Sequence, residues 1–84
     1  QGPWTDVYAL AATIYFCLTG QLPPESIQRL VRDTVMRPSE LGADIASNQE
    51  NALMKALAVY KKNRYESVRQ FMNAIYRKPR AKAP

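Results

Sequence analysis

Few side chains in this sequence are suited to chemistry, and they lie far apart. Asp6 stands in a stretch that is otherwise almost wholly apolar, and Cys17 follows in the same stretch, where we expect a buried, unreactive thiol. Asp44 and Asn48 have a suggestive spacing, but we interpret them as turn and helix-cap residues. The 84 residues include no histidine and three glycines. Neither a histidine-based site nor a glycine-rich phosphate loop is therefore expected.

Periodic apolar residues predict four helices and no strand, so the fold class is all-α. A Thr5 cap opens the first helix and Gly20 ends it. The second begins at Pro24, and its single narrow apolar stripe predicts a position on the surface. Capping boxes at residues 47–50 and 67–70 open the other two. The apolar positions of helices two to four are Ile27, Leu30, Val31, Leu53, Leu57, Tyr60, Val68, Phe71, Met72 and Ile75.

Residues 4–20, WTDVYALAATIYFCLTG, predict a helix that is apolar on nearly every side. Such a helix belongs at the centre of a sizeable core, and three short helices with narrow stripes could not easily cover it. Either the chain self-associates through the helix Val7 to Leu18, or it is a piece of a larger domain. We expect the larger domain, because the sequence starts directly before a well-capped, fully apolar helix.

The formal net charge of +5 is unevenly spread. Arg77, Lys78, Arg80 and Lys82 carry most of it, and the other residues are nearly neutral together. We therefore divide the chain into a helical body, residues 1–76, and a basic flexible tail or linker, residues 77–84. One cysteine permits no internal disulfide, which suits a reducing, cytoplasmic location. The longest apolar run is shorter than the roughly 20 residues of a membrane span.

Four motifs, in this order, resemble the C-terminal part of the C-lobe of bacterial-type serine/threonine protein kinases. TDVYAL (5–10) resembles the start of the central helix. PSEL (38–41) and LMKALA (53–58) are similar to the following loop and the penultimate helix. NRYES (63–67) resembles the arginine-bearing turn before the last helix. The resemblance covers residues 2–76 and implies a four-helix fragment that runs from the central helix to the last helix of the lobe.

The resemblance implies two structural anchors, Asp6 and Arg64. In the family the aspartate of the central helix accepts hydrogen bonds from backbone amides of the catalytic loop, and the arginine forms a buried ion pair with a glutamate. That glutamate would precede Gln1. Without the resemblance, Asp6 would be a favourable charge at a helix N-terminus. Arg64 would then belong to a solvated basic turn with Lys61 and Lys62.

The resemblance also implies a division of function. We expect no catalytic, nucleotide-binding or metal-binding residue in this chain, because phosphoryl transfer needs a nucleotide clamp, metal ligands and a base that its motifs do not supply. The parent would be the kinase that binds ATP and Mg²⁺, and this subdomain would scaffold the catalytic loop and offer docking surface. Its partner would be the missing remainder of the kinase domain, and any membrane attachment would come through the parent. The alternative is a stand-alone helical interaction or nucleic-acid-binding module, although the outer side of the last helix has few residues suited to reading bases.

Overall fold

The computed structural model describes residues 2–77, apart from the side chain of residue 26. It contains four α-helices: α1 (Pro3–Thr19), α2 (Ser26–Val31), α3 (Ser47–Ala56) and α4 (Val68–Tyr76). Two short 3-10 helices, η1 (Pro38–Leu41) and η2 (Lys61–Asn63), lie between them. The described residues contain no strand, which confirms the all-α prediction. The predicted basic tail lies outside them except for Arg77.

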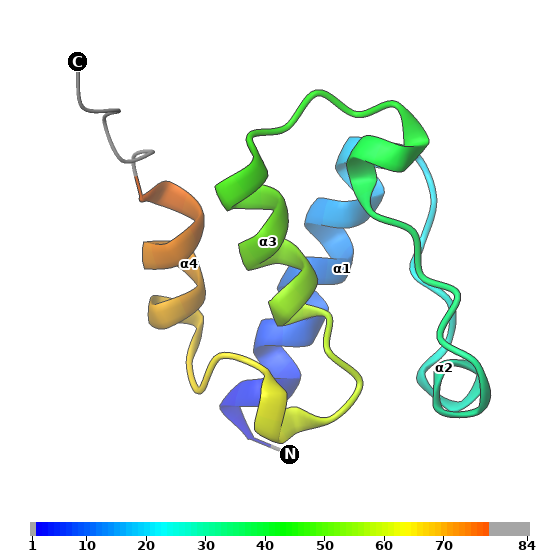
Figure 1. Ribbon diagram of the computed structural model, residues 1–84. Coiled ribbons are helices and arrows are strands. Elements are labelled where there is room, and N and C mark those ends of the chain that lie inside the picture. Colours follow the sequence, from blue (N-terminus) through cyan, green and yellow to red (C-terminus); the bar gives the residue numbers. More distant parts are fainter. Residues whose placement is uncertain (1, 78–84) are drawn as a thin grey trace.

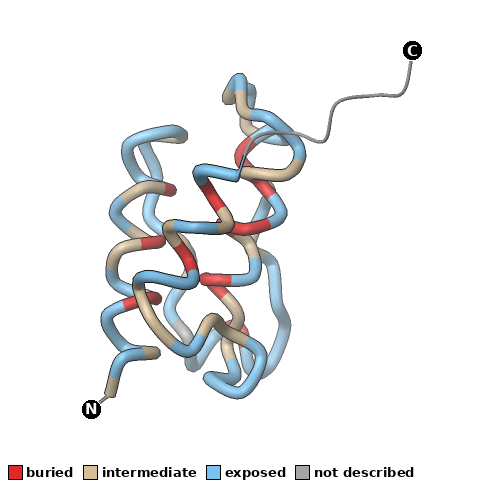
Figure 2. Tube along the Cα trace, turned by 90° about the vertical axis from the view of Figure 1, so that its left-hand side faces the viewer, coloured by how far each residue is buried: buried red, intermediate tan, exposed pale blue. Residues whose placement is uncertain are grey.

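Helices α1, α3 and α4 pack against one another, and α2 lies apart from this group (Figure 1). Each of the three packed helices has buried positions separated by exposed ones (Figure 2). Helix α4 lies against α3 along its length, which brings the last helix of the chain beside the penultimate one (Figure 1). The core is formed by Val7, Ala11, Tyr15, Ala52, Leu53, Ala56, Leu57, Phe71 and Ile75.

Helix α1 is buried on one side only. Val7, Ala11 and Tyr15 follow one another at intervals of four residues and form the buried side. Phe16 and Leu18 are 49% and 37% exposed. The prediction that α1 lies in the centre of the core is therefore wrong for this chain, because α3 and α4 cover one side and no described element covers the other. Cys17 lies on the open side and is exposed, so the expectation of a buried thiol is also wrong.

The ends of α1 agree with the sequence in part. The helix begins at Pro3 with Gly2 as N-cap, so Thr5 is not the cap. A proline fits the first helical turn because its fixed φ suits the helix and its missing N–H would be unpaired there. The end was predicted correctly: Gly20 has φ 75°, and its N–H donates to Phe16 O.

The two predicted capping boxes have different outcomes. The Ser47 hydroxyl does not cap α3, because the helix already includes Ser47 and its N-cap is Ala46. Ser67 does cap α4: its Oγ accepts a hydrogen bond from Gln70 N at 3.2 Å. The Gln70 side chain accepts from the N–H of Glu66, one residue before the position that a capping box requires. The second box is therefore confirmed in its main hydrogen bond.

Helices α2 and α3 differ from the predicted pattern in detail. Helix α2 begins at Ser26, two residues after the predicted start at Pro24. Helix α3 ends before Tyr60, which is 58% exposed and does not continue the buried side. The predicted loop between them contains η1, which a proline opens. Helices α2 and α3 are therefore both shorter than the apolar patterns that predicted them.

Candidate functional site

The candidate site lies where the start of α1 meets the turn after α3, and Arg64 is at its centre. Its Nε donates to Ala58 O at 2.5 Å, and its Nη2 donates to Val59 O at 2.9 Å. Its Nη1 donates to Trp4 O at 3.2 Å. Arg64 therefore connects the chain after α3 to the first turn of α1, and only a branched, planar group with several donors can do this at once.

Tyr8 places a second arginine beside this group. The Arg64 guanidinium lies over the Tyr8 ring, 4.7 Å from its centroid. Arg29 Nη1 donates to the Tyr8 hydroxyl at 3.4 Å. The pKa of Arg64 is lowered, chiefly by burial; Tyr8 has the next-largest effect and opposes the shift, and the nearby charge of Arg29 adds a smaller lowering. Arg64 has no carboxylate partner among residues 2–77, so its charge is balanced there only by carbonyl and ring dipoles.

Arg29 is nearly buried, with 5% of its surface exposed. It pairs with Asp33, with Nε 3.0 Å from Oδ1, and its Nη1 donates to Leu57 O at 2.7 Å. Burial opposes its charge, but the hydrogen bonds to Asp33 and Tyr8 outweigh that effect and raise the pKa of Arg29. The same contact with Arg29 lowers the pKa of Asp33. One local signal predicts this pair: an arginine and an aspartate stand four residues apart in the sequence.

Asp6 is exposed in the first turn of α1. No side-chain hydrogen bond or ion pair joins Asp6 to another residue of the described range. Both predicted anchors lie toward the same end of α1, because Arg64 donates to the carbonyl of Trp4. They do not contact each other, so their predicted roles depend on groups outside the described residues.

A basic cavity adjoins Arg64. It has a volume of about 390 Å³, and Trp4, Lys61, Lys62, Arg64, Tyr65 and Glu66 line it. The Lys61 ammonium lies 4.7 Å from the centroid of the Trp4 ring. Three cations and one carboxylate give the cavity a net positive charge, and two aromatic rings supply apolar contact. The cavity is therefore suited to an acidic side chain that reaches it from another segment.

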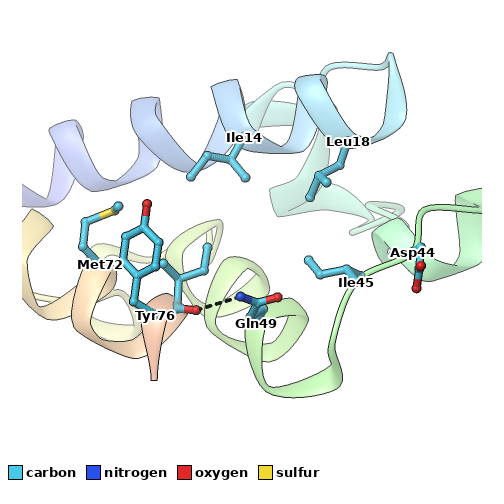
Figure 3. A pocket seen from close by; sticks show the side chains of 8 residues that line it. Ile14, Leu18, Asp44, Ile45, Gln49, Met72 and Tyr76 are labelled. Atoms are coloured by element: carbon cyan, nitrogen blue, oxygen red, sulfur yellow. Dashed lines mark hydrogen bonds between the residues drawn. The ribbon is translucent and has the colours of Figure 1, made fainter. Parts of the chain in front are cut away.

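A second cavity, of about 310 Å³, lies between α1, α3 and α4 and is mainly apolar (Figure 3). Ile14 and Leu18 enter it from α1, opposite Met72 and Tyr76 of α4 (Figure 3). Asp44 lies at its edge, whereas the Asn48 side chain donates to Arg77 O at 2.9 Å. Asp44 and Asn48 therefore have different surroundings and do not act together at one site. The described residues contain no cluster of three or more potential metal ligands.

Comparison with known proteins finds similarity to serine/threonine protein kinases. No protein-family model matches the chain. Serine/threonine-protein kinase PknB of Mycolicibacterium smegmatis is 30% identical over 86 residues, which covers 95% of this chain and 14% of that protein. A solved structure described as PpkA-294 in its apo form has a TM-score of 0.80 and 28% identity, and the match covers 89% of this chain and 27% of that chain.

The chain is similar in sequence and fold to part of a serine/threonine protein kinase, which is consistent with a C-terminal piece of its C-lobe. The resemblance stated from the motifs is thereby confirmed, as is the four-helix fold. This kinase-related chain spans about one seventh of the length of its relative PknB. In residues 2–77 no helix combines the length and the hydropathy needed to cross a bilayer.

Proposed function

We propose that this chain is the C-terminal helical subdomain of a serine/threonine protein kinase, where it scaffolds the catalytic loop and offers docking surface. The observation that carries the proposal is the environment of Arg64. A partly buried guanidinium is held by three carbonyls and opens to a basic cavity, without a carboxylate partner among residues 2–77. Burying a charge without a counter-charge is costly. A carboxylate from the preceding part of the kinase would remove that cost.

Asp6 has the complementary role in the proposal. Its carboxylate is exposed at the start of α1 and free to accept hydrogen bonds from another segment. By the family resemblance, that segment is the catalytic loop of the parent. Asp6 would hold the loop in place from behind without touching the substrate, so it is a positioning residue.

The open side of α1 supports the same proposal. Phe16 is 49% exposed there, and burial of such a side chain is worth about 1.5–3 kcal/mol. The remainder of the kinase domain would cover it. In the separate chain the exposed side of the helix between Val7 and Leu18, which includes Phe16, is available for self-association. ATP and Mg²⁺ would bind to the parent, in the cytoplasm, and this subdomain would contribute no ligand to either.

The test compares stability with activity in the Asp6→Asn variant. In the 84-residue chain we expect the free energy of unfolding to change by no more than about 0.5 kcal/mol, because the side chain is exposed. In the complete parent we expect phosphoryl transfer to fall at least tenfold, since the catalytic loop loses an ionised acceptor. Urea unfolding and a radiolabelled phosphate assay measure the two.

Asp44→Asn is the matched control, because it makes the same change at another exposed aspartate. It should leave both quantities unchanged. If Asp6→Asn leaves the parent fully active, or if the parent transfers no phosphoryl group, the scaffolding proposal fails.

A further inference from the structure

A third cavity, of about 420 Å³, lies where the neighbouring helices α3 and α4 meet (Figure 1). We call it the α3–α4 cavity. Among the described residues that line it are two cations and no carboxylate, so the cavity is positively charged. Its polar lining residues are Asn48, Asn51, Lys55, Tyr65 and Arg77. Those from α3 recur at intervals of three and four positions, so they share one side of that helix.

The two cations of the cavity act on the same aromatic ring. The Lys55 ammonium lies 4.6 Å from the centroid of the Tyr65 ring. That ring stacks on the buried ring of Phe71, with the two centroids 5.6 Å apart, and is thereby fixed against the core. Burial raises the pKa of the Tyr65 hydroxyl, and the charge of Arg77 opposes this shift. Lys55 and Arg77 therefore concentrate positive charge around Tyr65.

Hydrogen bonds hold the amide side of the cavity in place. Asn48 Nδ2 donates to Arg77 O at 2.9 Å and joins the end of α4 to the first turn of α3. Arg37 Nη2 donates to Asn51 Oδ1, so the acceptor of that amide is occupied and its remaining polar group is a donor. The donors of the cavity are therefore positioned before a ligand arrives, which lowers the entropy lost on binding.

We propose that the α3–α4 cavity binds a phosphorylated side chain of another protein segment, with the phosphate between Lys55 and Arg77. A phosphate monoester carries a charge of about −1.5 to −2 near neutral pH and has three strong acceptor oxygens. The two cations match that charge, and the Asn51 amide supplies a further donor. A carboxylate has one charge and two oxygens, so it matches these groups less well.

Two observations favour a protein segment as the source of the phosphate. The side of α3 from Asn48 to Lys55 is about 10 Å long, which accommodates about three residues of extended chain beside the phosphate. Lys55 and Phe71 already contact the Tyr65 ring, which leaves it poorly placed to stack on a nucleotide base. Tyr65 also lines the cavity at Arg64, but the two sets of cations differ, and the inference does not rest on the proposed kinase function.

Fluorescence anisotropy tests the proposal with the 84-residue chain and a short, labelled, otherwise uncharged peptide that contains one phosphoserine. We expect saturable binding with a dissociation constant below about 1 mM. A peptide with glutamate at that position should bind at least about fivefold more weakly, because it has less charge and fewer acceptors. The peptide with unmodified serine should show no saturable binding, and inorganic phosphate should compete with the phosphopeptide.

Substitutions then locate the binding site. Lys55→Gln and Arg77→Gln should each raise the dissociation constant of the phosphopeptide at least about fivefold, because each removes a cation from the cavity. Arg69→Gln is the matched control, since it removes the same charge from an exposed position of α4 outside the cavity. Lys62→Gln is a second control, in the cavity at Arg64. Both controls should leave the affinity unchanged, and circular dichroism shows that each variant is folded.

Three results would overturn the proposal. The first is equal affinity for the phosphorylated and the unmodified peptide. The second is an equal loss of affinity in all four variants, because it would assign binding to the overall positive charge of the chain. The third is tighter binding of a single-stranded oligonucleotide that depends on Lys55 and Arg77, which would assign the cavity to nucleic acid instead.

Discussion

Replacing Glu50 tests how far one buried carboxylate stabilises the connection between η1 and α3. Its side chain is 7% exposed. Arg37 Nε donates to Oε1 at 2.8 Å, and the backbone N–H of Ser39 donates to Oε2 at 2.7 Å. The carboxylate thus fixes the residues of η1 against the first turn of α3. A glutamate predicted to cap its own helix instead joins two segments.

We expect Glu50→Gln to lower the free energy of unfolding by about 1–2 kcal/mol near neutral pH. A hydrogen bond to a charged group contributes about 1.5–3 kcal/mol. The amide keeps one acceptor for the Ser39 N–H but loses the charge that faces Arg37. The Arg37 side chain is 40% exposed and recovers hydration, so the expected loss lies at or below the lower end of that range.

The same variant should change how stability depends on pH. Hydrogen bonds from Ser39 and then Arg37 lower the pKa of Glu50 below its ordinary value of 4.5, against the opposite effect of burial. The folded state therefore binds this proton less tightly than the unfolded state. The stabilisation is complete above the unfolded pKa and is lost as the pH falls through the folded pKa. Between about pH 5 and pH 3 the unsubstituted 84-residue chain should lose stability more steeply than Glu50→Gln.

Urea unfolding followed by circular dichroism, repeated across that pH range, measures both effects. Glu66→Gln is the matched control because Glu66 is exposed. Its free energy of unfolding should equal that of the unsubstituted 84-residue chain at every pH. Equal stability of Glu50→Gln and the unsubstituted 84-residue chain near neutral pH would refute the expected loss of about 1–2 kcal/mol. Parallel pH profiles for these two proteins would refute the assignment of the pH dependence to Glu50.

Two further predictions concern the arginine near the site and the nucleotide. Arg29→Met should lower the free energy of unfolding by about 2–3 kcal/mol, because Leu57 O loses a charged donor. Urea unfolding measures this loss, and a loss under about 0.5 kcal/mol would refute the role of Arg29. Titration calorimetry with Mg-ATP should give no binding heat for the 84-residue chain, since its sequence lacks the clamp and metal ligands of phosphoryl transfer, and saturable micromolar binding would contradict that expectation.

The sequence predicted the helices where local signals agreed with one another. Apolar periodicity, the glycine after α1 and the serine before α4 act within a few residues of chain, and each gave a helix end or a buried side that the structure confirms. Phe71 and Ile75, two of the predicted apolar positions, are buried because α4 has one clearly apolar side. These features depend on short-range geometry, which a single sequence contains.

The candidate site could be predicted only through the family resemblance. Composition and spacing alone gave Asp6 as a helix-end charge and Arg64 as part of a basic turn. The hydrogen bond between Arg64 and Trp4 O joins residues 60 positions apart. No local pattern contains such a contact, because it depends on how α1 and the turn after α3 meet. The structure supports the position of Arg64 in the site, and the carboxylate that would pair with it remains a prediction.

The orientation of α2 has a specific physical cause. Apolar periodicity shows that a helix has two different sides, but it does not show which side faces the protein. That choice depends on the free energy of all the groups that meet there. Arg29 on the inner side satisfies Leu57 O, Asp33 and the Tyr8 hydroxyl together, and the apolar side chains remain outside. An arginine that gains three partners can outweigh the burial of a short apolar stripe.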